Sequence, residues 1–361
     1  MTHILTVIGA RPQFIKAAAV SRQVARTSGL RETLIHTGQH YDANMSDVFF
    51  DELEMIKPTH HLGIGGGSHG AMTGQMLEAI ENLLHIERPD VLMVYGDTNS
   101  TLAGALAASK VGIPVAHVEA GLRSFNKNMP EEINRILTDH CAEFLFTPTT
   151  TATRNLLREG LGVSRIVESG DVMYDAAVLF GQLAKTKGAG ANRLGLPSSG
   201  YVLATIHRQE NTDNPARLAA IFKGLEKVAT EWPVILPIHP RTRKKLETAG
   251  LSSALSKLIT IDPVGYLDMV GLERGADIIV TDSGGVQKEA FFHKVPCVTL
   301  RDETEWVELV EAGWNRLVPP DSDTCIAEAI LAAFETSGSN IEPYGDGNAA
   351  EKIAAALKVI S

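Results

Sequence analysis

The sequence has little of what marks several classes of protein. Only three of its 361 residues are cysteine, Cys141, Cys297 and Cys325, and their odd number and wide spacing argue against a disulfide framework and a cysteine-based metal site. No apolar run reaches the roughly 20 residues that a membrane-spanning helix needs, and the first residues lack the pattern of a secretion signal. A formal net charge of −10 disfavours general binding of nucleic acid. We therefore expect a cytoplasmic protein that binds neither nucleic acid nor a membrane.

Common nucleotide and metal motifs are missing as well. No G-x-G-x-x-G follows the first apolar run and no G-K-[ST] occurs, which disfavours dinucleotide and P-loop sites. No predicted helix carries the H-x-x-x-H spacing of a zinc site; His207 and His239, at predicted strand ends, are better suited to contacting an anion. Five histidines of one insertion are expected on the surface or in local hydrogen bonds: His36, His40, His60, His61 and His69. We expect neither a metal nor a cofactor.

The pattern that is present is an alternation of short apolar runs with segments of helical period. "HILTVIG" precedes "QFIKAAAVSRQVARTSG", and the rhythm restarts at "YVLATIH" after a stretch rich in Gly, Ser and Pro. Together with the chain length, this predicts an α/β fold of two Rossmann-like, doubly wound domains that face a central cleft. We place the domains at 1–169 and 170–347; the last helix, in 348–361, is a candidate for packing back on the first domain.

The stretch "DSGGVQKEA" follows the apolar run "ADIIVT" and begins a predicted helix. Glycines at the carboxyl end of a parallel strand let a ligand approach the backbone, and the free amides of the next helix favour an anion. Ser283, Gly284 and Gly285 are therefore a candidate phosphate site, with Glu289 in reach of sugar hydroxyls. The alternative is a tight turn in which Ser283 only caps the helix.

A similar junction opens the chain. In "VIGARPQFIK", Gly9 ends a strand, and Arg11 and Lys16 flank the start of a helix. The planar guanidinium of Arg11 is suited to holding a diphosphate through two hydrogen bonds. The glycine-rich run 63–70 lacks a suitable preceding strand and indicates a loop.

Three acidic residues are expected at the same edge of the first domain. Asp97 and Glu119 end the strands of "VLMVYGD" and "PVAHVE", and Glu131 begins a helix in "MPEEINR". Neighbouring carboxylates suit proton transfer, because burial and like charge raise a pKa toward neutrality. The alternatives are a helix cap for Asp97 and a favourable helix-dipole interaction for Glu131.

Seven blocks along the chain resemble the non-hydrolysing UDP-N-acetylglucosamine 2-epimerases, in the order of that family. The blocks are "GARPQFIK", "YGDTNSTLAGALAA", "HVEAGLRS", "PEEINR", "ATIHRQEN", "HPRTR" and "TDSGGVQKEA". The resemblance implies a GT-B-like fold, a UDP-sugar substrate, a homodimer, and catalysis without NAD or metal.

The resemblance also assigns roles. It implies that Arg11 and His207 hold the diphosphate, that Ser283 and Gly284 bind phosphate, and that Glu289 holds the ribose. It assigns catalysis at C2 of the sugar to Asp97, Glu119 and Glu131. His207 is included in the same catalytic set. The expected substrate-binding set is completed by Lys16, Arg135, His239, Tyr266, Gly285 and Arg301. The implied mechanism is elimination of UDP to a 2-acetamidoglucal, followed by its return.

Some positions depart from much of the family. Gln13 stands where a Glu is common, "RDETEWVE" replaces a T-E-R-P-E segment, and His69 and Gly70 replace an Arg-Gln pair of members that substrate activates, although Gln39 and His40 match. These blocks look more like the branch that acts on UDP-2,3-diacetamido-2,3-dideoxyglucuronic acid. UDP-N-acetylglucosamine is the first substrate we expect, and that uronic acid the second. By fold alone the alternatives are a GT-B glycosyltransferase and a non-catalytic nucleotide-sugar sensor.

Overall fold

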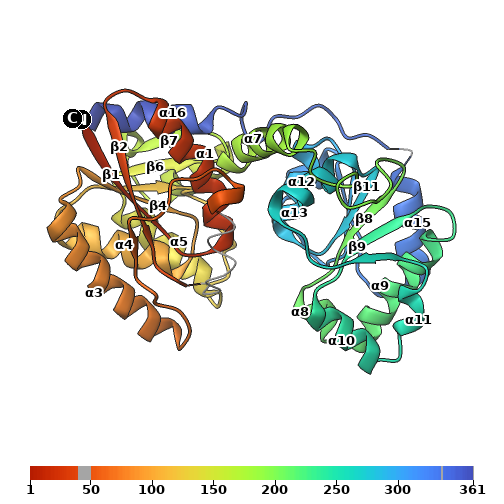
Figure 1. Cartoon of the computed structure of the whole chain (residues 1–361). Helices are drawn as coiled ribbons and strands as arrows, with labels where there is room; N and C mark the ends of the chain where they lie inside the picture. The colour runs from red at the N-terminus through yellow and green to blue at the C-terminus, as the bar shows by residue number, and fades with distance from the viewer. Residues whose placement is uncertain (40–49, 335, 361) are drawn as a thin grey trace. The chain divides into compact units, whose positions relative to one another are not determined.

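The computed structural model describes residues 1–39, 50–334 and 336–360. The chain forms two compact units, Met1–Leu179 with Glu342–Ser361, and Phe180–Ile341. Each unit contains a parallel sheet with helices on both faces (Figure 1). The predicted α/β class with two Rossmann-like, GT-B-like domains is therefore confirmed.

The division falls inside helix α7 (Val172–Thr186), later than the boundary expected at Gly170. The first turn of α7 is tied to the end of the chain, because the Asp175 carboxylate accepts hydrogen bonds from the amides of Ala349 (3.1 Å) and Ala350 (2.8 Å). These amides begin helix α16 (Ala349–Leu357), which packs on the first helix of the chain. Burial raises the pKa of Asp175, and the two amide hydrogen bonds oppose this rise. The start of α7 therefore belongs to the first unit.

The first unit is built on a seven-stranded sheet in the order β3-β2-β1-β4-β5-β6-β7. Its strands are β1 (Thr2–Ile8), β2 (Leu30–His36), β3 (His60–His61), β4 (Val91–Tyr95), β5 (Val115–Val118), β6 (Phe144–Thr147) and β7 (Ile166–Glu168). Its remaining helices are α1 (Arg11–Arg26), α3 (His69–Glu87), α4 (Asn99–Lys110), α5 (Pro130–Cys141) and α6 (Thr150–Arg158). All the paired strands run parallel, so the carboxyl ends of the strands lie along one edge.

The second unit has a six-stranded parallel sheet in the order β10-β9-β8-β11-β12-β13. Its strands are β8 (Val202–Thr205), β9 (Val234–Pro237), β10 (Ile259–Ile261), β11 (Ile278–Thr281), β12 (Cys297–Thr299) and β13 (Asn315–Leu317). Its helices are α8 (Gln209–Thr212), α9 (Pro215–Val228), α10 (Pro240–Thr248), α11 (Ser252–Leu255), α12 (Tyr266–Gly275), α13 (Gly284–Phe292), α14 (Val307–Glu311) and α15 (Asp323–Ala333).

The strands carry apolar residues on both faces because helices cover both. Every residue of β1 is buried. In β8, Val202 and Ala204 belong to one apolar cluster, whereas Leu203 and the preceding Tyr201 belong to the cluster on the opposite face. The strand order reverses between β1 and β4 and between β8 and β11. In open α/β sheets these reversals are where ligands bind, beyond the carboxyl ends of the strands.

Candidate active site

The reversal in the first sheet is organised by Gln13, a side chain that the sequence analysis noted only as a departure. Its Oε1 accepts from the amides of Gly9 (2.8 Å) and Ala10 (3.0 Å), while its Nε2 donates to the Tyr95 carbonyl (2.8 Å). The same amide nitrogen donates to the Thr101 hydroxyl (3.0 Å). Gln13 therefore ties the end of β1 to the end of β4 with a group that both donates and accepts, which a carboxylate cannot do.

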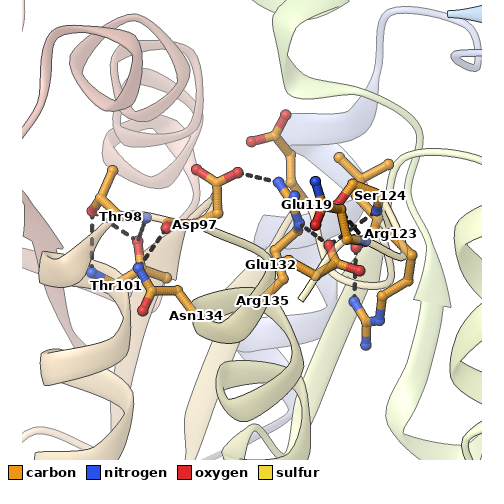
Figure 2. A network of polar contacts seen from close by, with 12 residues as sticks. Asp97, Thr98, Thr101, Glu119, Arg123, Ser124, Glu132, Asn134 and Arg135 are labelled. Carbon is orange, nitrogen blue, oxygen red and sulfur yellow. Dashed lines mark hydrogen bonds and ion pairs between the residues drawn. The ribbon is translucent and has the colours of Figure 1, made fainter. Parts of the chain in front are cut away.

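Asp97 lies one residue beyond Gly96, at the end of β4, and forms an ion pair with Arg135 of α5 (Figure 2). Its side chain is 34% exposed. Burial raises the pKa of Asp97; Arg135 and Lys16 oppose the rise, and Glu119 adds to it. The N-cap of α4 is Thr98, so the alternative role of Asp97 as a helix cap is wrong.

Glu119 follows β5 in a left-handed backbone conformation (φ 72°) and is buried. Its carboxylate forms an ion pair with the Lys16 ammonium of α1. A side chain on Gly96 would approach Glu119 Oε2 to 3.3 Å and Lys16 Nζ to 3.6 Å, so the pair lies directly beside the peptide that precedes Asp97. Burial lowers the pKa of Lys16, but Glu119, together with Asp97 and Asp171, outweighs burial and the net shift is upward. This amine is held as a cation.

Glu131 is in the first turn of α5, exposed, and near enough to Asp97 to raise its pKa. The neighbouring Glu132, which the sequence analysis did not single out, is buried and has a structural task. Its carboxylate accepts from the amides of Ser124 (2.9 Å) and Phe125 (2.8 Å) and from Arg135 Nε (3.0 Å). Burial raises its pKa, yet these donors lower it overall. Glu132 therefore orients the Arg135 guanidinium toward the Asp97 carboxylate (Figure 2).

A second buried pair underlies this edge of the sheet. His117 of β5 has Nδ1 2.7 Å from Asp139 Oδ1 and Nε2 2.8 Å from the Gly96 carbonyl. Asp139, on α5, is also 2.7 Å from Arg123 Nη1. Neither His117 nor Asp139 was a candidate from sequence, because a histidine inside an apolar strand carries no local sign of its partners.

Arg11 is the first residue of α1 and is exposed at the same reversal, between the ends of β1 and β4. Gly9, just before it, is packed against protein rather than open to a ligand. A Cβ at this position would lie 2.1 Å from Thr37 Oγ1 and 2.3 Å from Ser100 Oγ. The glycine is required there by close packing of the β1 end against β2 and α4.

The reversal in the second sheet is organised by Asp282, a fully buried residue after β11 that the sequence analysis quoted without a role. Its carboxylate accepts from the amides of His207 (3.1 Å) and Arg208 (3.0 Å) and from Asn211 Nδ2 (3.1 Å). The His207 side chain extends outward and is 57% exposed, with Nδ1 3.5 Å from Asp282. Asp282 therefore fixes the backbone that presents His207.

Ser283 occupies the N-cap position of α13, but its side chain makes no capping hydrogen bond. The geometry therefore does not support the alternative in which Ser283 only caps the helix. A Cβ on Gly285 would meet nothing nearer than Ser283 Oγ, at 3.9 Å, whereas one on Gly284 would lie 2.9 Å from Glu305 Oε1. Glu305 in turn accepts from the buried Arg301 (2.7 Å). The helix start therefore has amides, a hydroxyl and a guanidinium close together.

Tyr266 begins α12 and donates from its hydroxyl to Glu289 Oε1 (3.1 Å) on α13. Both side chains are buried. By contrast, His239 is an exposed N-cap whose ring accepts from the Arg241 amide (3.2 Å). This cap explains His239 without a ligand.

Two of the insertion histidines have the local hydrogen-bond partners that were expected, whereas His36 is buried and its ring packs against Phe14 and Phe50. His60 lies 2.8 Å from Glu87 Oε1, and His69 Nδ1 lies 3.1 Å from Asn99 Nδ2. His40 is outside the described residues. Within the described part of the chain, no group of three or more His, Cys, Asp or Glu residues is arranged to hold a metal ion. No helix in residues 1–39, 50–334 or 336–360 has the length and apolarity needed to cross a membrane.

Comparison with known proteins gives one consistent family. Residues 22–358 match the family model described as UDP-N-acetylglucosamine 2-epimerase. The UDP-2,3-diacetamido-2,3-dideoxy-D-glucuronate 2-epimerase of Pseudomonas aeruginosa is 52% identical over 97% of this chain and 98% of its own length. The UDP-N-acetylglucosamine 2-epimerase of Methanocaldococcus jannaschii is 45% identical over 97% of each chain. A crystal structure of the M. jannaschii enzyme, in complex with UDP-GlcNAc and UDP, has a TM-score of 0.85 at 43% identity and covers 99% of this chain and 100% of that one. The protein therefore belongs to the UDP-N-acetylglucosamine 2-epimerases, a family of isomerases.

Proposed function

We propose that the protein inverts C2 of a UDP-2-acetamido sugar and converts UDP-N-acetylglucosamine to UDP-N-acetylmannosamine. The observation that carries this proposal is the group at the carboxyl edge of the first sheet. There Asp97, with its raised pKa, lies between Arg135 and the Lys16–Glu119 pair. A raised pKa makes this carboxylate a stronger base than an ordinary one, which suits it to taking and returning a proton.

The chemistry explains why the site needs carboxylates and an anion clamp. The C2–H bond is not next to a carbonyl, so a carboxylate cannot remove that proton unaided. In our proposal the C1–O bond breaks first and its electron pair leaves with UDP. A carboxylate then takes the C2 proton, and the C–H electrons form the double bond of a 2-acetamidoglucal. A proton delivered to the opposite face of C2 and the return of UDP to C1 complete the cycle without any net redox change.

The residues divide into two sets in this scheme. In the first unit, Asp97, Glu119 and Glu131 exchange protons with C2, while Lys16 and Arg135 keep the charges of Glu119 and Asp97 balanced. Because unpaired buried charges are costly, these cations keep the carboxylates in place between turnovers.

In the second unit, residues at the sheet reversal hold UDP. Phosphate oxygens meet the Ser283 hydroxyl, the amides of Gly284 and Gly285 at the start of α13, and the guanidinium of Arg301. Glu289, oriented by Tyr266, accepts from ribose hydroxyls. His207 of this unit is a candidate for binding the diphosphate, and Arg11 is the corresponding candidate at the reversal of the first sheet. The ring of His239 already caps α10.

A second candidate substrate is UDP-2,3-diacetamido-2,3-dideoxyglucuronic acid. It is favoured by the 52% identity to the P. aeruginosa enzyme that is named for this sugar. Both sugars carry a 2-acetamido group and a UDP leaving group, so the same elimination applies to each.

We also propose a homodimer and a cytoplasmic location. Met129, Ile133 and Leu137 are spaced four residues apart on and just before α5, and they are 38%, 45% and 43% exposed. Such a stripe is the kind of surface that a second subunit covers. The three cysteines are free, as is usual in a reducing compartment. Light scattering of the purified protein tests the dimer, and a monomer at micromolar concentration would contradict it.

The deciding experiment supplies a UDP-sugar as the sole substrate in D₂O, without NAD or metal, and follows C2 by NMR. We expect the 2-epimer with deuterium at C2, because the proton taken by a carboxylate exchanges with solvent. Running both sugars separately ranks them by kcat/KM. A glycosyltransferase or a sensor would leave either sugar unchanged. Product that keeps its C2 hydrogen would contradict exchange of the C2 proton with solvent and, with it, the elimination proposed here.

A further inference from the structure

His117 lies inside the first sheet with both ring nitrogens opposite oxygen atoms. The side chain is fully buried, with Nε2 2.8 Å from the Gly96 carbonyl oxygen and Nδ1 2.7 Å from Asp139 Oδ1. A peptide carbonyl oxygen can only accept a hydrogen bond. Nε2 of His117 therefore carries a proton.

Asp139 is present as a carboxylate. Its other oxygen, Oδ2, accepts from the Gly121 amide (3.1 Å) and lies 2.7 Å from Arg123 Nη1. The Gly121 amide and the Arg123 guanidinium both donate to this oxygen, and the ionised form of the carboxyl group satisfies both donors. Because an ionised carboxylate only accepts, Nδ1 of His117 must also carry a proton. The ring is thus an imidazolium, whose charge is balanced by Asp139, while Arg123 is balanced by Glu159 (2.7 Å).

The imidazolium holds the peptide between Tyr95 and Asp97. Gly96 has a left-handed backbone (φ 63°), its amide donates to the Val118 carbonyl (3.0 Å), and its carbonyl accepts from His117. Val118 is followed directly by Glu119, which also has a positive φ. One ring therefore fixes the backbone next to two of the proposed proton-transfer residues.

The third such residue is tied to the same pair through its helix. Asp139 lies two turns beyond Glu131 on α5, which also carries Arg135. The β4–α4 connection, the end of β5 and helix α5 thus meet at His117 and Asp139. A displacement of any of them by about 1 Å would be enough to lower turnover about 100-fold in a proton-transfer site.

We propose that His117 is a positioning residue that donates from both ring nitrogens and so holds the backbone of Asp97 and Glu119 in place for proton transfer at C2. This inference rests on the proposed epimerase function for its kinetic consequence, but not for the protonation state of the ring. His117 itself touches no substrate in this scheme.

Two amide variants separate the two hydrogen bonds of the ring. In His117→Gln the side-chain nitrogen can occupy the place of Nε2 and still donate to Gly96. In His117→Asn it can occupy the place of Nδ1 and contact Asp139, but it cannot reach Gly96. We expect kcat to fall about 10- to 100-fold in His117→Asn and clearly less in His117→Gln, with calorimetric affinity for UDP unchanged in both. Equal kcat in wild type and His117→Asn would overturn the positioning role.

His3 offers a matched control. It is buried at the opposite, amino-terminal end of β1, and its ring also has two polar partners, Thr33 Oγ1 and Arg31 Nη2, each at 2.8 Å. His3→Asn should lower the thermal unfolding midpoint without a selective loss of kcat. The decrease in kcat can be divided by the decrease in the thermal unfolding midpoint for each variant. If this ratio is equal for His3→Asn and His117→Asn, His117 has only a structural role and the proposal is wrong.

A spectroscopic measurement on the wild-type protein covers the case in which the variants do not fold. With ¹⁵N-labelled histidine, we expect the two His117 nitrogens to give imidazolium shifts and two slowly exchanging N–H protons at neutral pH. A neutral-ring pattern for His117 would overturn the proposal. If the wild type fails to epimerise either sugar while this signature is present, the proposed function is wrong and the protonation assignment stands.

Discussion

Arg135 joins Asp97 to Glu132: its Nη1 pairs with the Asp97 carboxylate, and its Nε donates to Glu132 at 3.0 Å. Two backbone amides of the loop before α5 fix the Glu132 carboxylate. Glu132 in turn holds the Arg135 guanidinium on the side away from Asp97. This bracing keeps a partly exposed carboxylate in one orientation, which is a requirement of efficient proton transfer.

Asp97→Asn removes the proton-transfer group but keeps its shape and a partner for Arg135. We expect kcat to fall roughly 10²- to 10⁴-fold, with the affinity for UDP nearly unchanged, because UDP is assigned to other residues. Glu131→Gln should behave alike. Steady-state kinetics and titration calorimetry with UDP measure the two quantities. Loss of UDP binding in either variant would show that the roles are not separate.

The pH dependence of stability tests the upward shift in the pKa of Asp97. Burial, opposed by Arg135 and Lys16, raises this pKa above its unfolded value of about 3.9. The folded state therefore binds the proton more tightly, and this contribution to stability is present in acid and lost as pH rises through the folded pKa. We expect Asp97→Asn to gain unfolding free energy relative to wild type as pH rises from acid to neutral in urea titrations. The exposed Asp262→Asn controls for general charge effects, and a gain that falls with pH would contradict the shift.

Nucleotide affinity should depend on both sheet reversals. Arg11→Ala and Glu289→Ala should each weaken UDP binding about tenfold or more, because each removes a charged hydrogen-bonding group. Tyr266→Phe should weaken it less, since Glu289 stays in place without its phenol donor. Arg26→Ala, in the last turn of the same helix as Arg11, is the control. Unchanged affinity in both alanine variants would remove the proposed UDP site.

Velocity should depend hyperbolically on substrate concentration. His69 and Gly70 replace the Arg-Gln pair of activated members, and Gln39 is occupied by protein: its Oε1 accepts from Ser100 N (3.0 Å) and Ser100 Oγ (2.7 Å) at the start of α4. Gln39→Ala should therefore change stability but not the shape of the velocity curve. Sigmoidal kinetics that Gln39→Ala abolishes would instead establish a site for activating substrate. The neighbouring His40 lies outside the described residues.

Much of the fold was readable from local sequence. Alternating apolar and helical segments predicted parallel sheets, and the glycines after β4 and β11 placed Asp97 and Ser283 at strand ends. Elements with weak local signals were missed. Strands β3, β7 and β13 are only two or three residues long, and the 19-residue helix α3 was hidden in the segment treated as an insertion. Short edge strands bury few residues, so they leave little periodicity to detect.

By itself the sequence determined which residue types stand at the carboxyl ends of the strands, because continuous apolar runs mark the strands and a 3.6-residue period of apolar side chains marks the helices that follow. It could not determine their partners. Lys16 and Glu119 are 103 positions apart, and Gln13 and Tyr95 are 82 apart. Only the pairing of β1, β4 and β5 in one sheet brings these groups within hydrogen-bonding distance. The tertiary structure therefore decided the pKa shifts of Asp97 and Lys16, since burial and specific partners, rather than residue type, cause them.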